Sequence, residues 1–108
     1  MKPRALSAFV AALVFACADA SAQQTYTVTI ENLQFEPQTL TVKRGDRVVW
    51  VNQDLVPHTA TAEKSAPKNF DSHSIAPNTS WTYIASTPGR YAYMCTLHPT
   101  MKATLVVE

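Results

Sequence analysis

The chain has 108 residues, of which 46% are hydrophobic and 16% are charged, and its formal net charge at pH 7 is +1. This composition fits a single globular domain and excludes an intrinsically disordered chain. The nearly balanced charge argues against nucleic acid as a partner, because binding to phosphates depends on a clear excess of Lys and Arg.

The first 22 residues have the pattern of an export signal. A basic start at Lys2 and Arg4 precedes an apolar run over residues 5–16, and small residues at 20–22 form a small-x-small cleavage site. The apolar run is shorter than the ~20 residues that a membrane-spanning helix needs, and we expect no other segment to span a bilayer. We therefore predict a signal peptide over residues 1–22 and a periplasmic location for the mature protein.

Cys17 offers an alternative for the leader. The residues "VFAC" loosely resemble the lipid-attachment box of bacterial lipoproteins, in which the Cys is acylated, although Phe15 fits that box poorly. Cleavage by signal peptidase is the preferred interpretation. Either outcome leaves Cys95 without a disulfide partner in an oxidising compartment, so we expect this thiol to be occupied in another way.

Short β-rich runs separated by turn residues follow the leader, and most of them alternate apolar and polar positions. They predict strands at residues 25–30, 39–42, 47–52, 58–62, 80–85, 90–95 and 103–108. No helix longer than a turn or two is expected. The pattern predicts an all-β fold, a Greek-key antiparallel β-sandwich that forms one domain over residues 24–108.

Three metal-binding residue types lie close together near the C-terminus, in "YAYMCTLHPTM": Cys95, His98 and Met101. The two-residue period of a strand places Tyr91, Tyr93 and Cys95 on one face, which we expect to be the core face. A tight turn must then follow before the last strand begins. A thiolate, an imidazole and a thioether form a soft ligand set that selects copper over calcium or magnesium, and thioethers rarely ligate zinc.

A blue copper centre combines two imidazoles and a thiolate with a weak axial Met, so a second His is needed. His58 follows "WVNQDLVP", a predicted strand that ends in a proline-marked turn, and is the predicted second ligand. His73 lies in the polar stretch "FDSHS", which has no strand period, and is predicted to be a surface residue.

These residues carry a resemblance to a known family. The segment "FEPQTLTVKRGDRVVWVNQDLVPHT", followed by "PGRYAYMCTLHPTM", resembles the cupredoxins of the plastocyanin and azurin type. The short Cys-x-x-His-x-x-Met loop is more similar to that of amicyanin than to the longer loops of plastocyanin and pseudoazurin. One departure from the family is His73, where many relatives have Gly.

The resemblance implies one copper ion with three equatorial ligands and one axial ligand: His58, Cys95, His98 and, axially, Met101. It also implies that the backbone N–H of Thr59 donates to the Cys95 sulfur. A hydroxyl contact between Thr59 and Thr96 would tie the two ligand segments together. Such outer contacts orient the ligands and tune the metal.

The resemblance therefore implies a small exported blue copper protein that carries single electrons between redox partners. We expect a monomer that docks briefly through the edge of His98 and its neighbours Leu97, Pro99 and Thr100. Catalysis is not expected, because copper oxidases and nitrite reductases use additional His, often as His-x-His pairs, that this chain lacks. The alternative is a periplasmic copper-handling protein, although no Met-rich or His-rich tract supports it.

Overall fold

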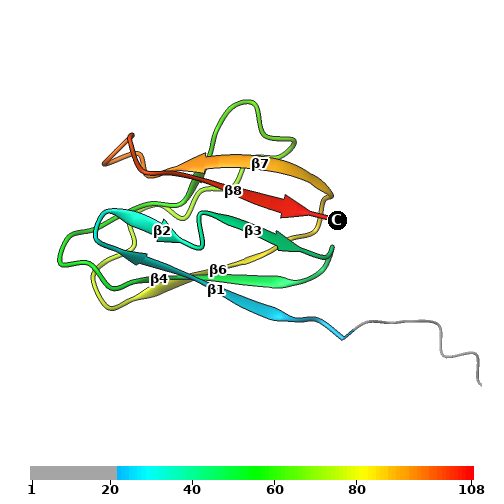
Figure 1. Cartoon of the computed structure of the whole chain (residues 1–108), viewed down its shortest axis with the longest axis horizontal. Helices are drawn as coiled ribbons and strands as arrows, with labels where there is room; N and C mark the ends of the chain where they lie inside the picture. The colour runs from blue at the N-terminus through cyan, green and yellow to red at the C-terminus, as the bar shows by residue number, and fades with distance from the viewer. Residues whose placement is uncertain (1–21) are drawn as a thin grey trace, which may run out of the picture.

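The computed structural model describes residues 22–108, so the predicted signal peptide and Cys17 lie outside the described residues. Eight strands form two four-stranded sheets with the orders β2-β1-β4-β6 and β3-β8-β7-β5 (Figure 1). The strands are β1 (Thr25–Glu31), β2 (Gln34–Glu36), β3 (Thr39–Val42), β4 (Arg47–Asn52), β5 (Thr61–Ala62), β6 (Ser80–Ile84), β7 (Gly89–Met94) and β8 (Lys102–Val107). Within residues 22–108, no helix is long and apolar enough to cross a membrane.

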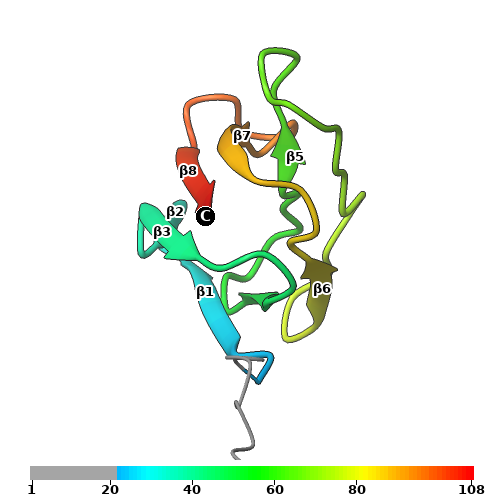
Figure 2. The same cartoon turned by 90° about the vertical axis from the view of Figure 1, so that its right-hand side faces the viewer.

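The two sheets face each other as a sandwich, which confirms the predicted all-β fold (Figure 2). The sheets are mixed, however, and not purely antiparallel. Strand β1 pairs with β4 in parallel, and β3 pairs with β8 in parallel, while the other pairs are antiparallel. From β3 onward, consecutive strands alternate between the sheets until β8 pairs with β7. Strand β4 therefore returns to the first sheet beside β1 and runs in the same direction.

The sequence patterns missed strand β2 and predicted too long a strand at β5, which covers only Thr61–Ala62 and not residues 58–62. Strand β2 has only three residues, and Pro37 follows it at once, so no alternating pattern is visible. It forms a hairpin with β1 through Asn32 and Leu33, whose φ angles of 54° and 58° are those of a tight two-residue turn. His58 lies before the short β5 and pairs with Ile75 as an isolated bridge.

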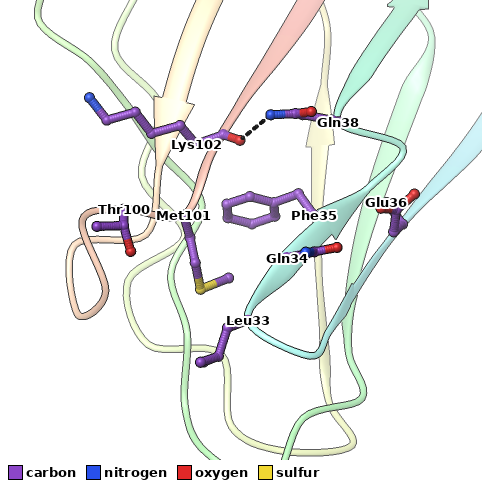
Figure 3. A pocket seen from close by; sticks show the side chains of 8 residues that line it. All are labelled: Leu33, Gln34, Phe35, Glu36, Gln38, Thr100, Met101 and Lys102. Carbon is purple, nitrogen blue, oxygen red and sulfur yellow. Dashed lines mark hydrogen bonds between the residues drawn. The ribbon is translucent and has the colours of Figure 1, made fainter.

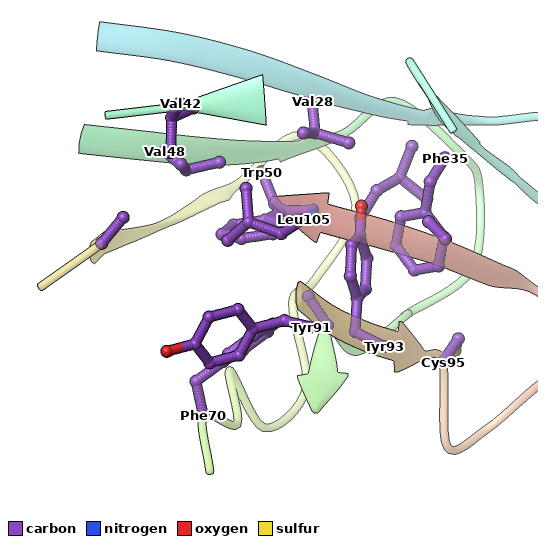
Figure 4. Packing of buried hydrophobic residues seen from close by; sticks show 14 of the residues in the cluster. Val28, Phe35, Val42, Val48, Trp50, Phe70, Tyr91, Tyr93, Cys95 and Leu105 are labelled. Atoms are coloured by element: carbon purple, nitrogen blue, oxygen red, sulfur yellow. The ribbon is translucent and has the colours of Figure 1, made fainter. Parts of the chain in front are cut away.

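The core lies between the sheets and is rich in aromatic rings (Figure 4). Trp50 is fully buried and meets Tyr93 edge-on, with 5.5 Å between ring centroids, and Tyr93 in turn packs edge-on against Phe35 at 4.9 Å. Tyr91 and Tyr93 of β7 and Cys95, which directly follows the strand, are all buried, as the two-residue period predicts. The Tyr91 hydroxyl donates to the Thr87 carbonyl at 2.6 Å and fixes the turn that precedes β7.

Three loops gather at one end of the sandwich, on the left in Figure 1. They connect β1 with β2, β4 with β5, and β7 with β8. The β4–β5 loop carries His58, and the segment between β7 and β8 carries the other predicted ligands. The fold therefore brings together side chains that are far apart in the sequence.

Candidate metal centre

Cys95 lies directly after β7, and its side chain is fully buried. The chain then turns within six residues to begin β8. Two backbone hydrogen bonds close this turn: the Cys95 N–H donates to the Met101 carbonyl at 3.1 Å, and the Met101 N–H donates to the His98 carbonyl at 2.9 Å. The short turn therefore holds Cys95, His98 and Met101 at one place without a flexible segment between them.

His58 is positioned by a second set of hydrogen bonds in the β4–β5 loop. Its backbone N–H donates to the Ile75 carbonyl at 3.2 Å, and the Ile75 N–H donates to the His58 carbonyl at 2.7 Å. The buried amide of Asn52 donates to the carbonyls of Val56 and Ile75, both at 2.9 Å. Its oxygen accepts from the Asp54 N–H at 2.9 Å. Asn52 thus supports the loop from inside, where water could not replace these bonds.

The side chains of His58, Cys95 and His98 converge, and their ligand atoms all lie within 4.8 Å of one another. The Cys95 Sγ lies 3.6 Å from His58 Nδ1 and 3.9 Å from His98 Nδ1. Bonds from a metal ion of about 2.0 Å to nitrogen and about 2.3 Å to sulfur, at an angle of about 120°, separate the two donors by about 3.7 Å. The three donors therefore fit around one ion.

Met101 lies beside the same site and is nearly buried, with 4% of its surface exposed. Its side chain lines a cavity of about 290 Å³ together with Leu33 and Phe35, and Figure 3 shows the thioether directed toward Leu33. The charged side chains of Glu36 and Lys102 line the same cavity. The cavity shows that space remains around the thioether, and axial ligation by Met101 stays a prediction.

Thr59 and Thr96 make the contacts implied by the resemblance. The Thr59 N–H donates to the Cys95 Sγ at 3.3 Å. The hydroxyls of Thr59 and Thr96 lie 3.1 Å apart, and the Thr96 N–H donates to the Thr59 Oγ1 at 2.9 Å. Because Thr59 follows one predicted ligand and Thr96 follows another, these bonds tie the β4–β5 loop to the segment after β7.

Asp54 is a functional candidate that the sequence patterns did not reveal. Its Oδ2 lies 2.7 Å from His58 Nε2, the ring nitrogen that faces away from Cys95. The carboxylate also accepts hydrogen bonds from the backbone N–H groups of Asn32 and Leu33 at 2.7 and 3.0 Å. A carboxylate four residues before a predicted His ligand was a usable signal, but the "DLVPH" segment has no regular period that predicts where its side chains point.

The surroundings of Asp54 favour its ionised form. Burial by itself raises the pKa of this carboxyl, but the hydrogen bonds that it accepts and the nearby His58 outweigh burial. The pKa is therefore held below its usual value of 3.8. An ionised carboxylate can only accept hydrogen bonds, so Asp54 presents an acceptor to His58 Nε2.

His73 lies outside the cluster of three donors. Its side chain is 87% exposed, and its Nδ1 lies 3.7 Å from the Asp71 carboxylate. The prediction of a surface residue is confirmed. Its φ of 54° lies in the left-handed region that glycine adopts most easily.

His58 and His98 differ in their access to solvent. His58 is fully buried, whereas His98 is half-buried between exposed neighbours. The apolar side chains that are exposed in the loops at this end of the sandwich are Leu33, Leu55, Val56 and Leu97. Leu55 is the most prominent of them, with 94% of its surface exposed. Among these four, Leu97 is the sequence neighbour of His98.

Comparisons with known proteins show the family to which this chain belongs. A sequence profile of the cupredoxin-like domain matches residues 4–107. Amicyanin-alpha of Methylorubrum extorquens is 33% identical over 107 residues, which cover 96% of this chain and 88% of the relative. The chloroplastic plastocyanin of Tetradesmus obliquus is 35% identical over 61% of this chain and 51% of its own length.

Solved structures with the same fold include a variant of amicyanin in its Cu(I) form, with a TM-score of 0.73 and 27% identity over 82% of this chain and 87% of that chain. A copper-containing nitrite reductase from Thermus scotoductus also matches, with a TM-score of 0.73 and 26% identity over 78% of this chain. The match covers only 22% of the reductase chain. The profile match over nearly the whole length and the similarity to amicyanin-alpha show that this chain belongs to the cupredoxin family.

Proposed function

We propose that this protein is a small blue copper protein that carries single electrons between redox partners. The observation that supports this most is the convergence of two imidazoles and one thiolate, His58, Cys95 and His98, within 4.8 Å of one another. When bound, copper supplies a one-electron exchange between Cu(II) and Cu(I). Met101 is proposed as the axial ligand. The similarity of this chain to amicyanin and plastocyanin supports the proposed role as an electron carrier.

The protein would hold the ion in a nearly fixed arrangement. The Thr59 N–H donates to the Cys95 Sγ at 3.3 Å and withdraws electron density from the sulfur. The bonds between Thr59 and Thr96 keep His58 and Cys95 at a constant separation, since each Thr follows one of these two ligands. A site that changes little between two oxidation states requires little rearrangement when an electron arrives or leaves.

Electrons would enter and leave through His98, because this imidazole is half-buried while His58 and Cys95 are fully buried. The exposed Leu97 beside His98, and the exposed Leu55 in the β4–β5 loop at the same end of the sandwich, suit brief docking of a redox partner through a small interface. We propose that the protein works as a monomer in the periplasm after cleavage of the signal peptide over residues 1–22, with the cupredoxin domain over residues 24–108.

We also propose that the protein is not an enzyme. The four proposed ligands would fill the coordination of one copper ion and leave no open position for a substrate. The nitrite reductase that shares the fold is more than four times as long as the matched region, since the match covers 22% of it. Its chemistry therefore does not transfer to this chain.

The test is to load the purified mature protein with Cu(II), record the visible spectrum and titrate with a mild reductant. We expect an intense blue thiolate-to-copper band that bleaches on reduction and returns on oxidation. In Cys95→Ser the band should be absent, because serine offers no thiolate. A colourless complex that loses its copper to a modest chelator would refute the carrier and favour copper delivery or sequestration.

A further inference from the structure

The carboxylate of Asp54 connects His58 with the turn between β1 and β2. Oδ2 contacts His58 Nε2 at 2.7 Å and accepts from the Leu33 N–H at 3.0 Å, while Oδ1 accepts from the Asn32 N–H at 2.7 Å. Both carboxylate oxygens are therefore engaged. The carboxylate cannot rotate away from the imidazole without losing two hydrogen bonds to the backbone.

The turn is shaped to provide these two donors. Asn32 and Leu33 both have positive φ angles, 54° and 58°, and this conformation directs two successive N–H groups toward Asp54. Such a turn costs conformational energy for residues other than glycine, and the bonds to the carboxylate offset part of that cost. The β1–β2 hairpin therefore supports the carboxylate, which in turn contacts His58.

The orientation of the His58 ring determines which of its nitrogens faces Asp54 and which faces the proposed metal. Nδ1 lies 3.6 Å from the Cys95 sulfur, on the side of the proposed metal, while Nε2 faces Asp54. A neutral imidazole has one protonated nitrogen and one free lone pair. If Nε2 carries the proton and donates to Asp54, the lone pair on Nδ1 is available to a metal ion.

The pair is also shielded from water. The side chain of His58 is fully buried, and that of Asp54 is only 13% exposed. A negative charge in such surroundings acts more strongly on a nearby ion than a charge in open solvent does. Through the imidazole, the carboxylate favours the more highly charged oxidation state of a bound metal.

We propose that Asp54 is a positioning residue of the metal centre, which fixes His58 in the Nε2-protonated tautomer and lowers the reduction potential of the bound copper. The tautomer depends only on the protein, whereas the effect on the potential rests on the proposed function. The two parts are therefore tested separately, on copper-free protein and on copper-loaded protein.

The first experiment measures the nitrogen chemical shifts of His58 by NMR in the copper-free protein. In the wild type we expect a protonated Nε2 whose proton exchanges slowly with water. In Asp54→Ala the proton should exchange at least tenfold faster, and both tautomers should be populated. A wild-type His58 protonated on Nδ1 would overturn the proposal without the need for any variant, as would an unchanged His58 in Asp54→Ala.

The second experiment compares reduction potentials of the copper-loaded protein for the wild type, Asp54→Asn and Glu31→Gln. Glu31→Gln is the matched control, because it removes one exposed negative charge from the end of the same hairpin strand. At a fixed solution potential, Asp54→Asn should lower the Cu(II):Cu(I) ratio about tenfold, a rise in potential of about 59 mV. Glu31→Gln should change the ratio by much less.

Equal shifts for Asp54→Asn and Glu31→Gln would overturn the effect on potential and reduce Asp54 to a structural support of the hairpin. A merely structural role would lower the unfolding midpoint of Asp54→Asn without moving the potential relative to the control. Failure of the wild type to form a reversible blue centre would refute the proposed function. The copper-free NMR measurement would still decide the role of Asp54 toward His58.

Discussion

His58 and His98 have the same side chain, but the fold places them in different surroundings. His58 is fully buried, is held by Asp54 through Nε2 and lies in a loop fixed by Asn52. His98 is half-buried and sits in a turn next to the exposed Leu97. We infer a division of roles in which His58 anchors the ion inside the protein and His98 provides the contact with redox partners.

Met101 provides a prediction at the scale of a single residue. Met101→Leu keeps an apolar side chain of similar size but removes the thioether, which as the proposed weak axial donor would stabilise Cu(II). We expect the blue colour to remain, because Cys95 is intact, and the reduction potential to rise by roughly 60 mV, or about tenfold in the Cu(I):Cu(II) ratio. Cyclic voltammetry of the loaded protein measures this shift.

Met94→Leu is the matched control for this prediction. Met94 ends β7 and lies on the face opposite to Cys95, half-buried and away from the donors. The same substitution there should leave the potential unchanged. An unchanged potential in Met101→Leu would show that Met101 is not the axial ligand.

At the scale of the secondary structure elements, single backbone positions decide how the strands connect. The β1–β2 hairpin depends on positive φ angles at Asn32 and Leu33, and the turn before β4 depends on Gly45 with a φ of 93°. Gly89, at the start of β7, has a φ of 150° and lies against Pro67 of the loop after β5. Through this close approach, the long connection between β5 and β6 packs against the start of β7.

Gly89→Ala tests this packing. A Cβ at position 89 would lie 2.6 Å from the Pro67 Cγ, and the φ angle would also be strained for alanine. We expect a loss of roughly 2–4 kcal/mol in the free energy of unfolding, measured by urea denaturation of the copper-free protein.

Gly45→Ala serves as its control, because φ is also positive there but a Cβ would meet no atom within 4 Å. In this variant the free energy of unfolding should fall by about 1–2 kcal/mol, the cost of the strained backbone alone. Equal losses in the two variants would mean that Pro67 moves aside and that the contact contributes nothing.

At the scale of the whole molecule, the metal centre joins two parts of the chain that lie 37 residues apart, as the separation of His58 and Cys95 shows. One part is the loop from β4 of the first sheet to β5 of the second, and the other is the turn between β7 and β8 of the second sheet. An ion bound by both parts would therefore hold the loop that links the two sheets against the β7–β8 turn. In a domain this small, such a connection contributes noticeably to stability.

Copper binding should accordingly raise the thermal stability of the folded protein. At a free copper concentration 100 times the dissociation constant, the free energy of unfolding should increase by about 2.7 kcal/mol. For a domain of this size, that increase corresponds to a rise in Tm of roughly 10 °C or more. Scanning calorimetry of loaded and copper-free protein measures the difference. Cys95→Ser should lose most of this stabilisation, and a wild-type Tm that is insensitive to copper would contradict a site that joins the two segments.

The sequence alone predicted the strands other than β2 and pointed to Cys95, His98 and Met101 as candidate ligands. Alternation of apolar and polar residues reports the local geometry of a strand, so the buried face of β7 with Tyr91, Tyr93 and Cys95 was predicted correctly. The spacing of Cys95, His98 and Met101 within one short turn is likewise a local property. The predicted association of His58 with these residues came from the chemistry of blue copper centres and from the family resemblance.

Only the tertiary structure decided the features that depend on contacts between distant segments. Parallel pairing of β1 with β4 follows from the path of the chain between the sheets, which strand patterns do not encode. The contacts of Asp54 with His58 and with the β1–β2 turn arise because two loops pack against each other at one end of the sandwich. Period and spacing describe neighbours along the chain, whereas the direction of a side chain in an irregular loop is set by the segments that surround it.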